Sequence, residues 1–321
     1  MTARDLLPIA VAVALTALVP LFVTTNTVLN FLVLVLIVAL AAQGWNILGG
    51  FGGQFSFGHA AFFGTGAYAT AILQTRFGVN AWAGFALGVA AGALAGWIIG
   101  YLSFRSGLRG SYFALVTLAF AEVFRILANA AEVTGGAAGM LIKLDMRPAN
   151  FQFASRAVFF WVALALVAAA LVLTRGIECS RFGARLVAIR ENEEAAQALG
   201  VDTLRTKLAA ITLSAGVTAA SGCLYAQYFL FVDAQIAYGT WISVEALLAP
   251  IIGGAGTAFG PLIGALSLHA LGEIAKLFAG RVPGIDLALF GCLLVAAVAF
   301  APEGILGLAR RTRPRLKPAA G

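Results

Sequence analysis

Charged residues are scarce in this chain. Asp, Glu, Lys and Arg make up 11% of its 321 residues, whereas hydrophobic residues make up 61%, and the mean hydropathy is +0.95. A soluble domain carries roughly 25% charged residues, which cover its surface. A chain with so few charges cannot present a surface of this size to water, so most of its exterior must face lipid. The sequence therefore predicts an integral membrane protein.

Cysteine and histidine are scarce as well. The three cysteines are scattered and odd in number, and His59 and His269 lie far apart, so we expect neither a disulfide framework nor a metal site. The chain also lacks a GxxxxGK[ST] phosphate loop and a GxSxG nucleophile elbow. We therefore expect no catalytic residues and no cofactor, and hence no enzyme. If the chain transports actively, the energy must come from a partner or from an ion gradient.

Long apolar runs fill most of the sequence. A bilayer core about 30 Å thick needs roughly 20 apolar residues per helix, which predicts an all-α, polytopic transmembrane bundle of about 8 to 10 spans. The first run is interpreted as a retained span rather than a cleaved leader. The expected spans are residues 6–23, 28–48, 59–75, 82–104, 111–128, 157–175, 208–231, 258–279 and 284–301, with a shorter run at 241–256 that either crosses or re-enters.

The 21 basic residues are unevenly distributed about these spans. With ten spans, most of them lie on the side of the amino terminus, and basic residues mark the cytoplasmic side. Both termini are therefore expected in the cytoplasm, and the connection between residues 128 and 157 outside. The net charge of +7 arises at the ends of apolar runs and in the tail, so nucleic acid is not an expected partner.

Two glycine-rich breaks interrupt the apolar runs, at residues 46–68 and 251–265. Each contains a GGxG sequence, then a Phe-Gly pair and then a new span. Transporters often contain interrupted helices in corresponding halves. We therefore expect broken or re-entrant helices at both positions, and a degenerate internal repeat is one interpretation of them.

Isolated carboxylates inside spans mark ion-coupled carriers. Glu122 lies three residues before Arg125, and Glu273 lies three residues before Lys276, so each has a neutralising partner on its own helix. Glu245 lacks an obvious local partner. It is therefore a candidate residue of a translocation path, and it keeps a proton-coupled carrier open as an alternative.

The most polar stretch is AIRENEEAAQALGVDTLRTK, residues 188–207. Its pattern predicts a short helix parallel to the membrane, with Ala195 and Ala196 forming a surface for close approach. Gly200 provides a bend where a helix can end, and Lys207 begins the next span. Such a helix either docks into a cleft of a soluble partner or lies at the interface as an ordinary amphipathic helix.

This stretch resembles the EAA loop of ABC importer permeases, in the form found in branched-chain amino acid transport permeases. Glu194, Ala195 and Ala196, three further residues and Gly200 match the core of that loop, whereas the proline of the general importer signature is absent. Further segments resemble that family in order, from about residue 29 to 308, and the whole is similar to its M-type (LivM-like) subunit. These segments are GWNILGGFGGQFSFGHAAFFGTGAYATAIL, RGSYFALVTLAFAEVF, TGGAAGM, GGAGTAFGPLIGA and PEGILG.

The resemblance implies a permease subunit of the bacterial inner membrane that pairs with a second, homologous permease. Two cytoplasmic ATP-binding subunits would dock on the EAA loops, and a periplasmic binding protein would deliver a branched-chain or related amino acid to the outer loop around residues 134–150. Glu194 through Gly200 would transmit closure of the ATPases, with Arg190 as a further contact. The substrate itself is not specified by the resemblance.

Gln54, Ser56 and His59 match the early glycine segment of the family and are further candidates for the translocation path. Each of these side chains either lines the path or satisfies backbone groups freed by a broken helix. We expect one transmembrane permease domain over residues 1–308, with the coupling loop at about 180–207, and a basic cytoplasmic tail at 309–321. A self-sufficient secondary carrier or channel and a non-transporting membrane scaffold remain alternatives.

Overall fold

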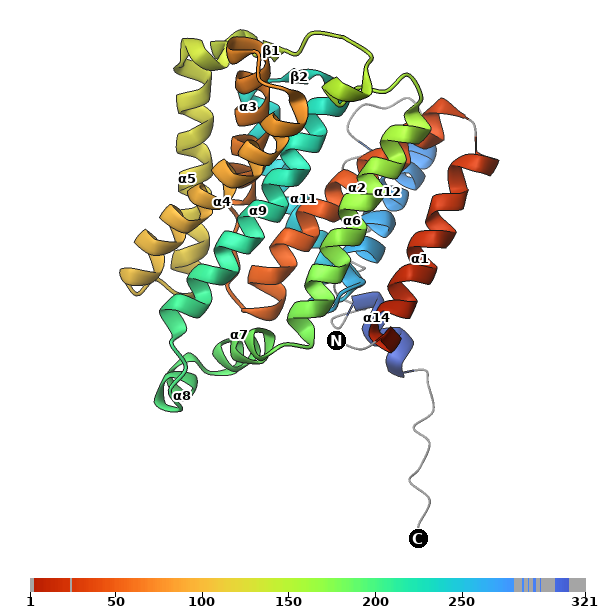
Figure 1. Ribbon diagram of the computed structural model, residues 1–321. Helices are drawn as coiled ribbons and strands as arrows, with labels where there is room; N and C mark the ends of the chain where they lie inside the picture. Colours follow the sequence, from red (N-terminus) through yellow and green to blue (C-terminus); the bar gives the residue numbers. More distant parts are fainter. Residues whose placement is uncertain are drawn as a thin grey trace.

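The computed structural model describes residues 3–23, 25–279 and 304–311, together with residues 285, 288, 291, 292 and 295. The expected span at 284–301 lies largely outside these residues, as does the tail beyond residue 311. Among the described residues, seven helical segments are long and apolar enough to cross a membrane. The predicted all-α, polytopic bundle is confirmed (Figure 1).

The long helices pack side by side into one bundle (Figure 1). They are α1 (Ala3–Phe22), α2 (Asn26–Trp45), α3 (His59–Phe77), α4 (Ala81–Arg105), α5 (Gly110–Ala130), α6 (Arg156–Glu178), α9 (Thr203–Phe229), α11 (Thr240–Gly253) and α12 (Gly260–Ala279). The shorter helices are η1 (Asn46–Phe51), η2 (Glu132–Thr134), η3 (Gly136–Ala138), η4 (Pro148–Asn150), α7 (Arg181–Glu191), α8 (Glu193–Ala198), α10 (Ala234–Ala237) and α14 (Gly304–Arg311). The run at 241–256 forms α11, which together with α10 is long enough to cross.

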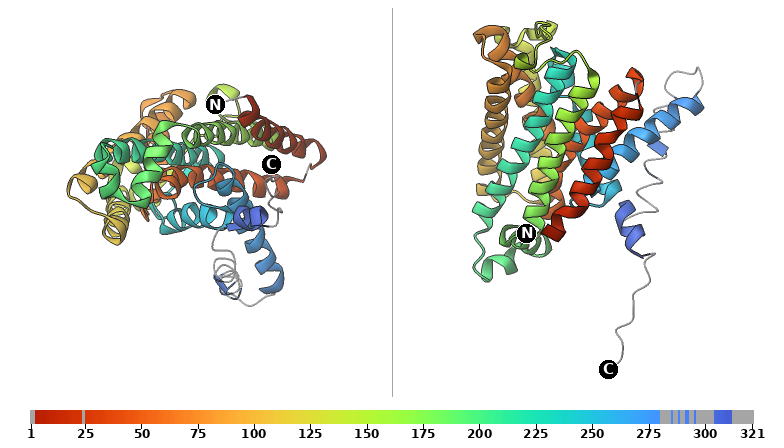
Figure 2. Two further views of the ribbon diagram at one scale, coloured as in Figure 1. Left: turned by 90° about the horizontal axis from the view of Figure 1, so that it is seen from below. Right: turned by 45° about the vertical axis from the view of Figure 1, so that its right-hand side comes forward.

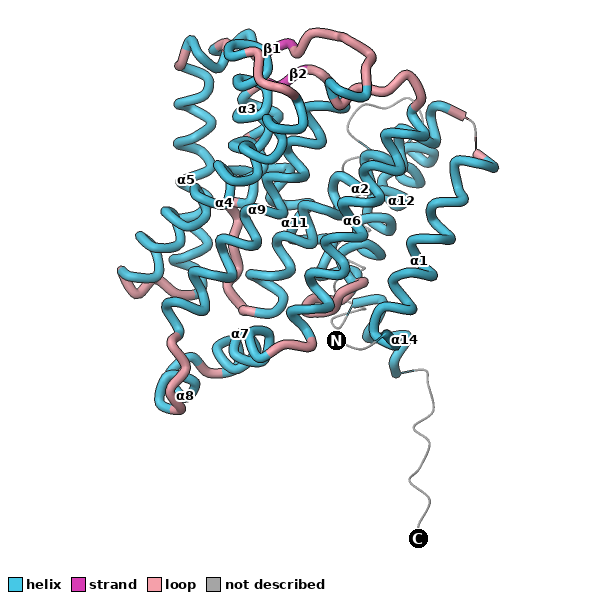
Figure 3. Tube along the Cα trace, in the orientation of Figure 1, coloured by secondary structure: helices cyan, strands magenta, loops and turns pink. Residues whose placement is uncertain are grey.

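The two ends of the bundle carry different structures. Strands β1 (Met140–Leu141) and β2 (Phe231–Val232) pair antiparallel at one end, where the long connection between α5 and α6 also lies. Helices α7 and α8 lie at the opposite end (Figure 3). The start of α1 belongs to that second end, because Arg175 near the end of α6 forms an ion pair with Asp5 at 2.7 Å.

Helices α2 and α9 form the centre of the bundle. In the most apolar stretch of each segment, 83% of the residues are buried in α2 with η1 and 72% in α9, whereas only 11% are buried in α1. Helix α1 packs along α6 at one edge of the bundle, near α12, and α4 and α5 lie at the opposite edge (Figure 2). The exposed apolar side chains of α1 and α5 therefore belong to surfaces that lipid or a second membrane protein would cover.

A row of glycines lets α4 pack closely against its neighbours. The glycines recur every fourth residue and so lie along one face of the helix; they are Gly84, Gly88, Gly92, Gly96 and Gly100. A Cβ atom on Gly92 would overlap that of Ala219 on α9, and one on Gly100 would lie 2.5 Å from Ile211 Cγ2. Small residues permit such close approach where lipid supplies no hydrophobic drive for association.

Candidate functional site: the coupling segment and the glycine crossing

The polar stretch folds as two short helices rather than the single helix expected, because the chain breaks between them. Asn192 has an extended backbone (φ −158°, ψ 106°), and its side chain accepts a hydrogen bond from the Ala195 N–H at 2.9 Å, which caps α8. Ser180 caps α7 in the same way, through the Gly183 N–H at 3.1 Å. We call residues 180–202, which contain both helices, the coupling segment.

The residues that resemble the EAA core differ in exposure. Ala196 is buried, whereas Glu194, Ala195 and Leu199 point outward, and Leu199 is 87% exposed. The two alanines therefore do not share one surface as expected. Gly200 has a left-handed backbone (φ +86°) just after α8, as the predicted bend requires. The result is a small outward-facing tip with one large apolar side chain, Leu199, almost fully exposed.

A buried ion pair holds this tip against the bundle. The Lys207 ammonium group on α9 contacts the Glu193 carboxylate at 2.5 Å, and their side chains are only 5% and 13% exposed. Arg109, before α5, reaches the other oxygen of Glu193 at 3.3 Å. The ring of Phe104 lies under the Lys207 nitrogen, 4.8 Å from it. This anchor was not predicted from the sequence, because Lys207 was considered there only as the start of the next span.

Arg190, in the last turn of α7, connects the coupling segment to the first glycine-rich break. Its guanidinium group donates a hydrogen bond to the Gly50 carbonyl at 2.9 Å and contacts Glu191. Gly53 has φ +65°, and a Cβ atom there would lie 2.5 Å from Arg190 Cγ. The side chain therefore lies directly on the backbone of the break.

The two glycine-rich breaks meet each other at this point. After α2 the chain continues as a π-helix, η1, and its Gly50 approaches the late break so closely that a Cβ atom would lie 2.6 Å from the Gly256 nitrogen. The Asn46 side chain donates to the Thr257 carbonyl at 2.9 Å and accepts from the Gly256 N–H at 2.8 Å. We call residues 46–53 and 253–260 together the glycine crossing.

A second amide reinforces the crossing from inside the bundle. Gln43, fully buried on α2, donates to the Ala258 carbonyl at 2.7 Å and accepts from the Thr174 hydroxyl at 2.9 Å. Buried amides inside a membrane are costly unless they are bonded. The sequence shows Gln43 and Asn46 as polar residues in an otherwise apolar run, but their partners lie more than 130 residues away.

The candidate path residues have distinct surroundings. Ser56 and His59 are buried: the Ser56 hydroxyl accepts from the Gly58 N–H at 3.2 Å, and His59 Nε2 lies 2.9 Å from the Ser214 hydroxyl on α9. Gln54 donates to the Gly52 carbonyl, but its side-chain oxygen is buried without a partner. Ser56 thus bonds to a backbone N–H group freed by the broken helix. Gln54 keeps a side-chain oxygen that could still accept a hydrogen bond.

Glu245 is half-buried on α11, and one of its carboxylate oxygens finds no hydrogen-bond partner in the part of the chain that the structure describes. The neighbouring Ser243 accepts a hydrogen bond from the Ala60 N–H at 2.9 Å, which ties the start of α3 to α11. The structure thus joins the helices that carry His59 and Glu245. The Glu122–Arg125 and Glu273–Lys276 pairs expected from spacing are present, at 2.5 and 2.7 Å.

Fold and site together define a polytopic helical membrane protein whose coupling segment at one end is connected to a crossing of broken helices. The chain matches the family described as branched-chain amino acid transport system / permease component over residues 27–298. It belongs to this family of transport permeases.

Two kinds of curated relatives support this assignment. The high-affinity branched-chain amino acid transport system permease protein LivM of Escherichia coli (strain K12) is 30% identical, over 93% of this chain and 73% of LivM. LivM of Salmonella typhimurium is 28% identical, over 94% of this chain and 74% of LivM. The permease protein LivH of Salmonella typhimurium is 24% identical, over 84% of this chain and 91% of LivH. No solved structure matches the chain significantly.

Proposed function

We propose that this chain is the permease subunit of an ATP-driven ABC importer that carries branched-chain or related amino acids across the bacterial inner membrane. The family membership and the similarity to LivM over most of both chains support this function. The chain has no phosphate loop of its own, so the energy comes from partner subunits. The observation that carries the proposal is the exposed tip of α8, held by the buried Glu193–Lys207 pair and connected through Arg190 to the glycine crossing.

The end of the bundle that carries α7 and α8 faces the cytoplasm in this proposal, and both termini lie on that side. The distribution of basic residues supports this orientation. Each of two cytoplasmic ATP-binding subunits docks on one permease, with Glu194, Ala195 and Leu199 entering its cleft. The second permease is a homologue, and the similarity of this chain to LivH as well as LivM supports such a pair.

Closure of the ATPases displaces α8, and the displacement passes along α7 to Arg190 and the Gly50 carbonyl. A crossing made of backbone on both sides suits this purpose, since no side chains interlock between residues 50 and 256. Gln54, Ser56, His59 and Glu245 lie on or beside the elements that would then shift. At the opposite end, the connection between α5 and α6 meets a periplasmic binding protein that delivers the amino acid.

The test compares one substitution at two exposed alanines of the same end. Ala195 in α8 and Ala184 in α7 both face outward, and Ala195→Asp and Ala184→Asp add the same charge. The full transporter is assembled in proteoliposomes with its two ATPases, the second permease and the binding protein. Uptake of labelled leucine, isoleucine and valine is measured together with ATP hydrolysis stimulated by the loaded binding protein.

We expect Ala195→Asp to abolish stimulated hydrolysis and uptake together, because the charge blocks docking, while Ala184→Asp resembles the unmodified transporter. Equal effects of the two substitutions would contradict the role of α8. Leucine movement by the purified chain alone, driven by a proton gradient without ATPases, would favour the secondary-carrier alternative. That result would assign the unpartnered carboxylate of Glu245 to proton coupling.

A further inference from the structure

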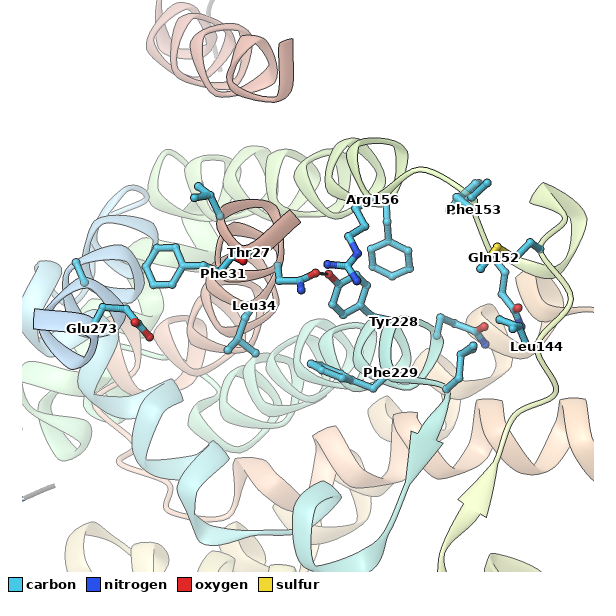
Figure 4. Close-up of a pocket in the computed structure, with 18 of the residues that line it drawn as sticks. Thr27, Phe31, Leu34, Leu144, Gln152, Phe153, Arg156, Tyr228, Phe229 and Glu273 are labelled. Carbon is cyan, nitrogen blue, oxygen red and sulfur yellow. Dashed lines mark hydrogen bonds between the residues drawn. The ribbon is translucent and has the colours of Figure 1, made fainter. Parts of the chain in front are cut away.

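A large pocket opens at the end of the bundle opposite the coupling segment. Its volume is about 930 Å³, and it lies between α2, α6, α9 and α12 beneath the connection that leads into α6 (Figure 4). Sites for small organic ligands usually measure roughly 300 to 1,000 Å³ and are mostly apolar, with a few polar groups that set orientation. The walls here follow that pattern, with Phe31, Leu34, Phe159 and Phe229 among the apolar side chains.

The pocket contains an amide that lacks partners. Gln227 on α9 is 2% exposed, and among the described residues neither its oxygen nor its nitrogen has a hydrogen-bond partner. Burial of an unbonded amide costs free energy, which a ligand with both a donor and an acceptor would recover. Asn30 and Tyr228, which also line the pocket, bond to each other through the Tyr228 hydroxyl and the Asn30 oxygen. The amide oxygen of Asn30 keeps a second lone pair for a ligand donor.

A cationic group reaches the same space. The Arg156 side chain at the start of α6 extends toward Tyr228 in the pocket (Figure 4). Its guanidinium group donates a hydrogen bond to the Asn26 carbonyl at 3.3 Å, and no carboxylate of the described residues lies within ion-pair distance of it. Arg binds carboxylates with two parallel hydrogen bonds, so this guanidinium group is available for an anionic group of a ligand.

From these groups we infer that the pocket binds a free α-amino acid with an apolar side chain. The ligand carboxylate pairs with Arg156, the ammonium group donates to side-chain amide oxygens such as that of Asn30, and the apolar side chain lies against Phe159 and Phe229. The inference extends the proposed function, because it places a substrate site inside this subunit at the end that would receive cargo from the binding protein. It does not depend on how the coupling segment works.

The experiment uses thiol protection in the complex of both permeases and the ATPases, without binding protein. Leu34→Cys, in a chain whose three native cysteines are replaced by serine, places a reporter thiol on the pocket wall outside the proposed ligand contacts. Its rate of reaction with a small methanethiosulfonate is measured with increasing L-leucine or L-leucine methyl ester. Arg156→Gln is compared with Arg76→Gln, which alters an arginine outside the pocket lining.

We expect leucine to slow labelling and its methyl ester, which lacks the carboxylate, to have little effect. Arg156→Gln should raise the half-protecting leucine concentration about tenfold, as loss of a charge-assisted hydrogen bond implies, and Arg76→Gln should leave it unchanged. Gln227→Leu should raise it as well. An unchanged labelling rate without leucine in Arg156→Gln shows that the pocket itself is intact.

The inference is overturned if leucine gives no protection, if the ester protects equally, or if Arg156→Gln has no effect on the protecting concentration. ATP-dependent uptake by the same complex, reconstituted in proteoliposomes with its binding protein, separates this inference from the proposed function. Protection without ATP-dependent uptake would uphold the site and contradict the importer. Uptake without protection would support the importer function and contradict the proposed amino-acid site in the pocket.

Discussion

The ion pair that anchors α8 allows a quantitative prediction, because its two members are not equally replaceable. Glu193→Gln leaves the buried Lys207 ammonium group with the Phe104 ring but without a carboxylate. Removal of one member of a buried pair costs about 3 to 5 kcal/mol. Lys207→Met, by contrast, leaves Glu193 in contact with Arg109 at 3.3 Å. The half-exposed arginine then neutralises part of the buried carboxylate charge.

We therefore expect Glu193→Gln to destabilise the attachment of α8 by about 3 kcal/mol, at the lower end of the range for broken buried pairs. We expect Lys207→Met to destabilise it by about 1.4 kcal/mol, because one ion contact survives. The double variant should lie near the unmodified chain, since an amide and an apolar side chain leave no buried charge unpaired.

The assay measures how often α8 detaches. Ala196 is 3% exposed, so a thiol in Ala196→Cys reacts with a maleimide only when the segment opens. Each 1.4 kcal/mol changes the opening equilibrium about tenfold, so labelling should accelerate about 100-fold in Glu193→Gln and about tenfold in Lys207→Met. Equal acceleration in the two single variants, or additive effects in the double variant, would refute the reasoning.

Two further substitutions test close backbone contacts. Gly92→Ala should lower the thermal unfolding temperature in detergent, because its Cβ atom overlaps that of Ala219, and overpacking typically costs about 1 to 3 kcal/mol. Adding Ala219→Gly should restore the unfolding temperature. A double variant that unfolds at the same temperature as Gly92→Ala would contradict the predicted contact. Gly53→Ala should reduce uptake about tenfold more than Gly78→Ala does, because overpacking costs at least about 1 kcal/mol. Both glycines have φ near +65°, but only at Gly53 does the new atom meet Arg190, so equal losses of uptake would assign the effect to backbone strain alone.

Sequence reasoning predicted the helical bundle well, because the length of a hydrophobic run is a local signal. The boundaries of the long helices agree with the expected spans to within a few residues where both are described. The run at 241–256 was ambiguous because a short apolar segment gives no length signal, and α10 supplies the missing turn. The prediction of a single polar helix was wrong, because Asn192 caps a new helix, α8, instead of continuing α7.

Sequence reasoning pointed to the segments of the candidate site but not to the contacts between them. The coupling residues and the two glycine-rich breaks are visible in the sequence, since each interrupts a regular pattern. That Arg190 lies on Gly50, and that Asn46 joins Gly256 and Thr257, depends on packing between segments far apart in the chain. No local pattern encodes such contacts. The pocket opposite the coupling segment was missed for the same reason, since Arg156 and Gln227 line one space only through the fold.

Docking of cytoplasmic ATPases on α8 requires that the coupling segment face the cytoplasm. Ala195→Cys in a chain without the native cysteines, expressed with its partners, can be labelled with a membrane-impermeant maleimide in sealed vesicles of known orientation. Leu141→Cys, an exposed position at the opposite end, serves as the matched control. We predict that Ala195→Cys reacts only in inside-out vesicles and Leu141→Cys only in right-side-out vesicles. Reaction of Ala195→Cys in right-side-out vesicles would contradict the account, because no cytoplasmic ATPase could then reach α8.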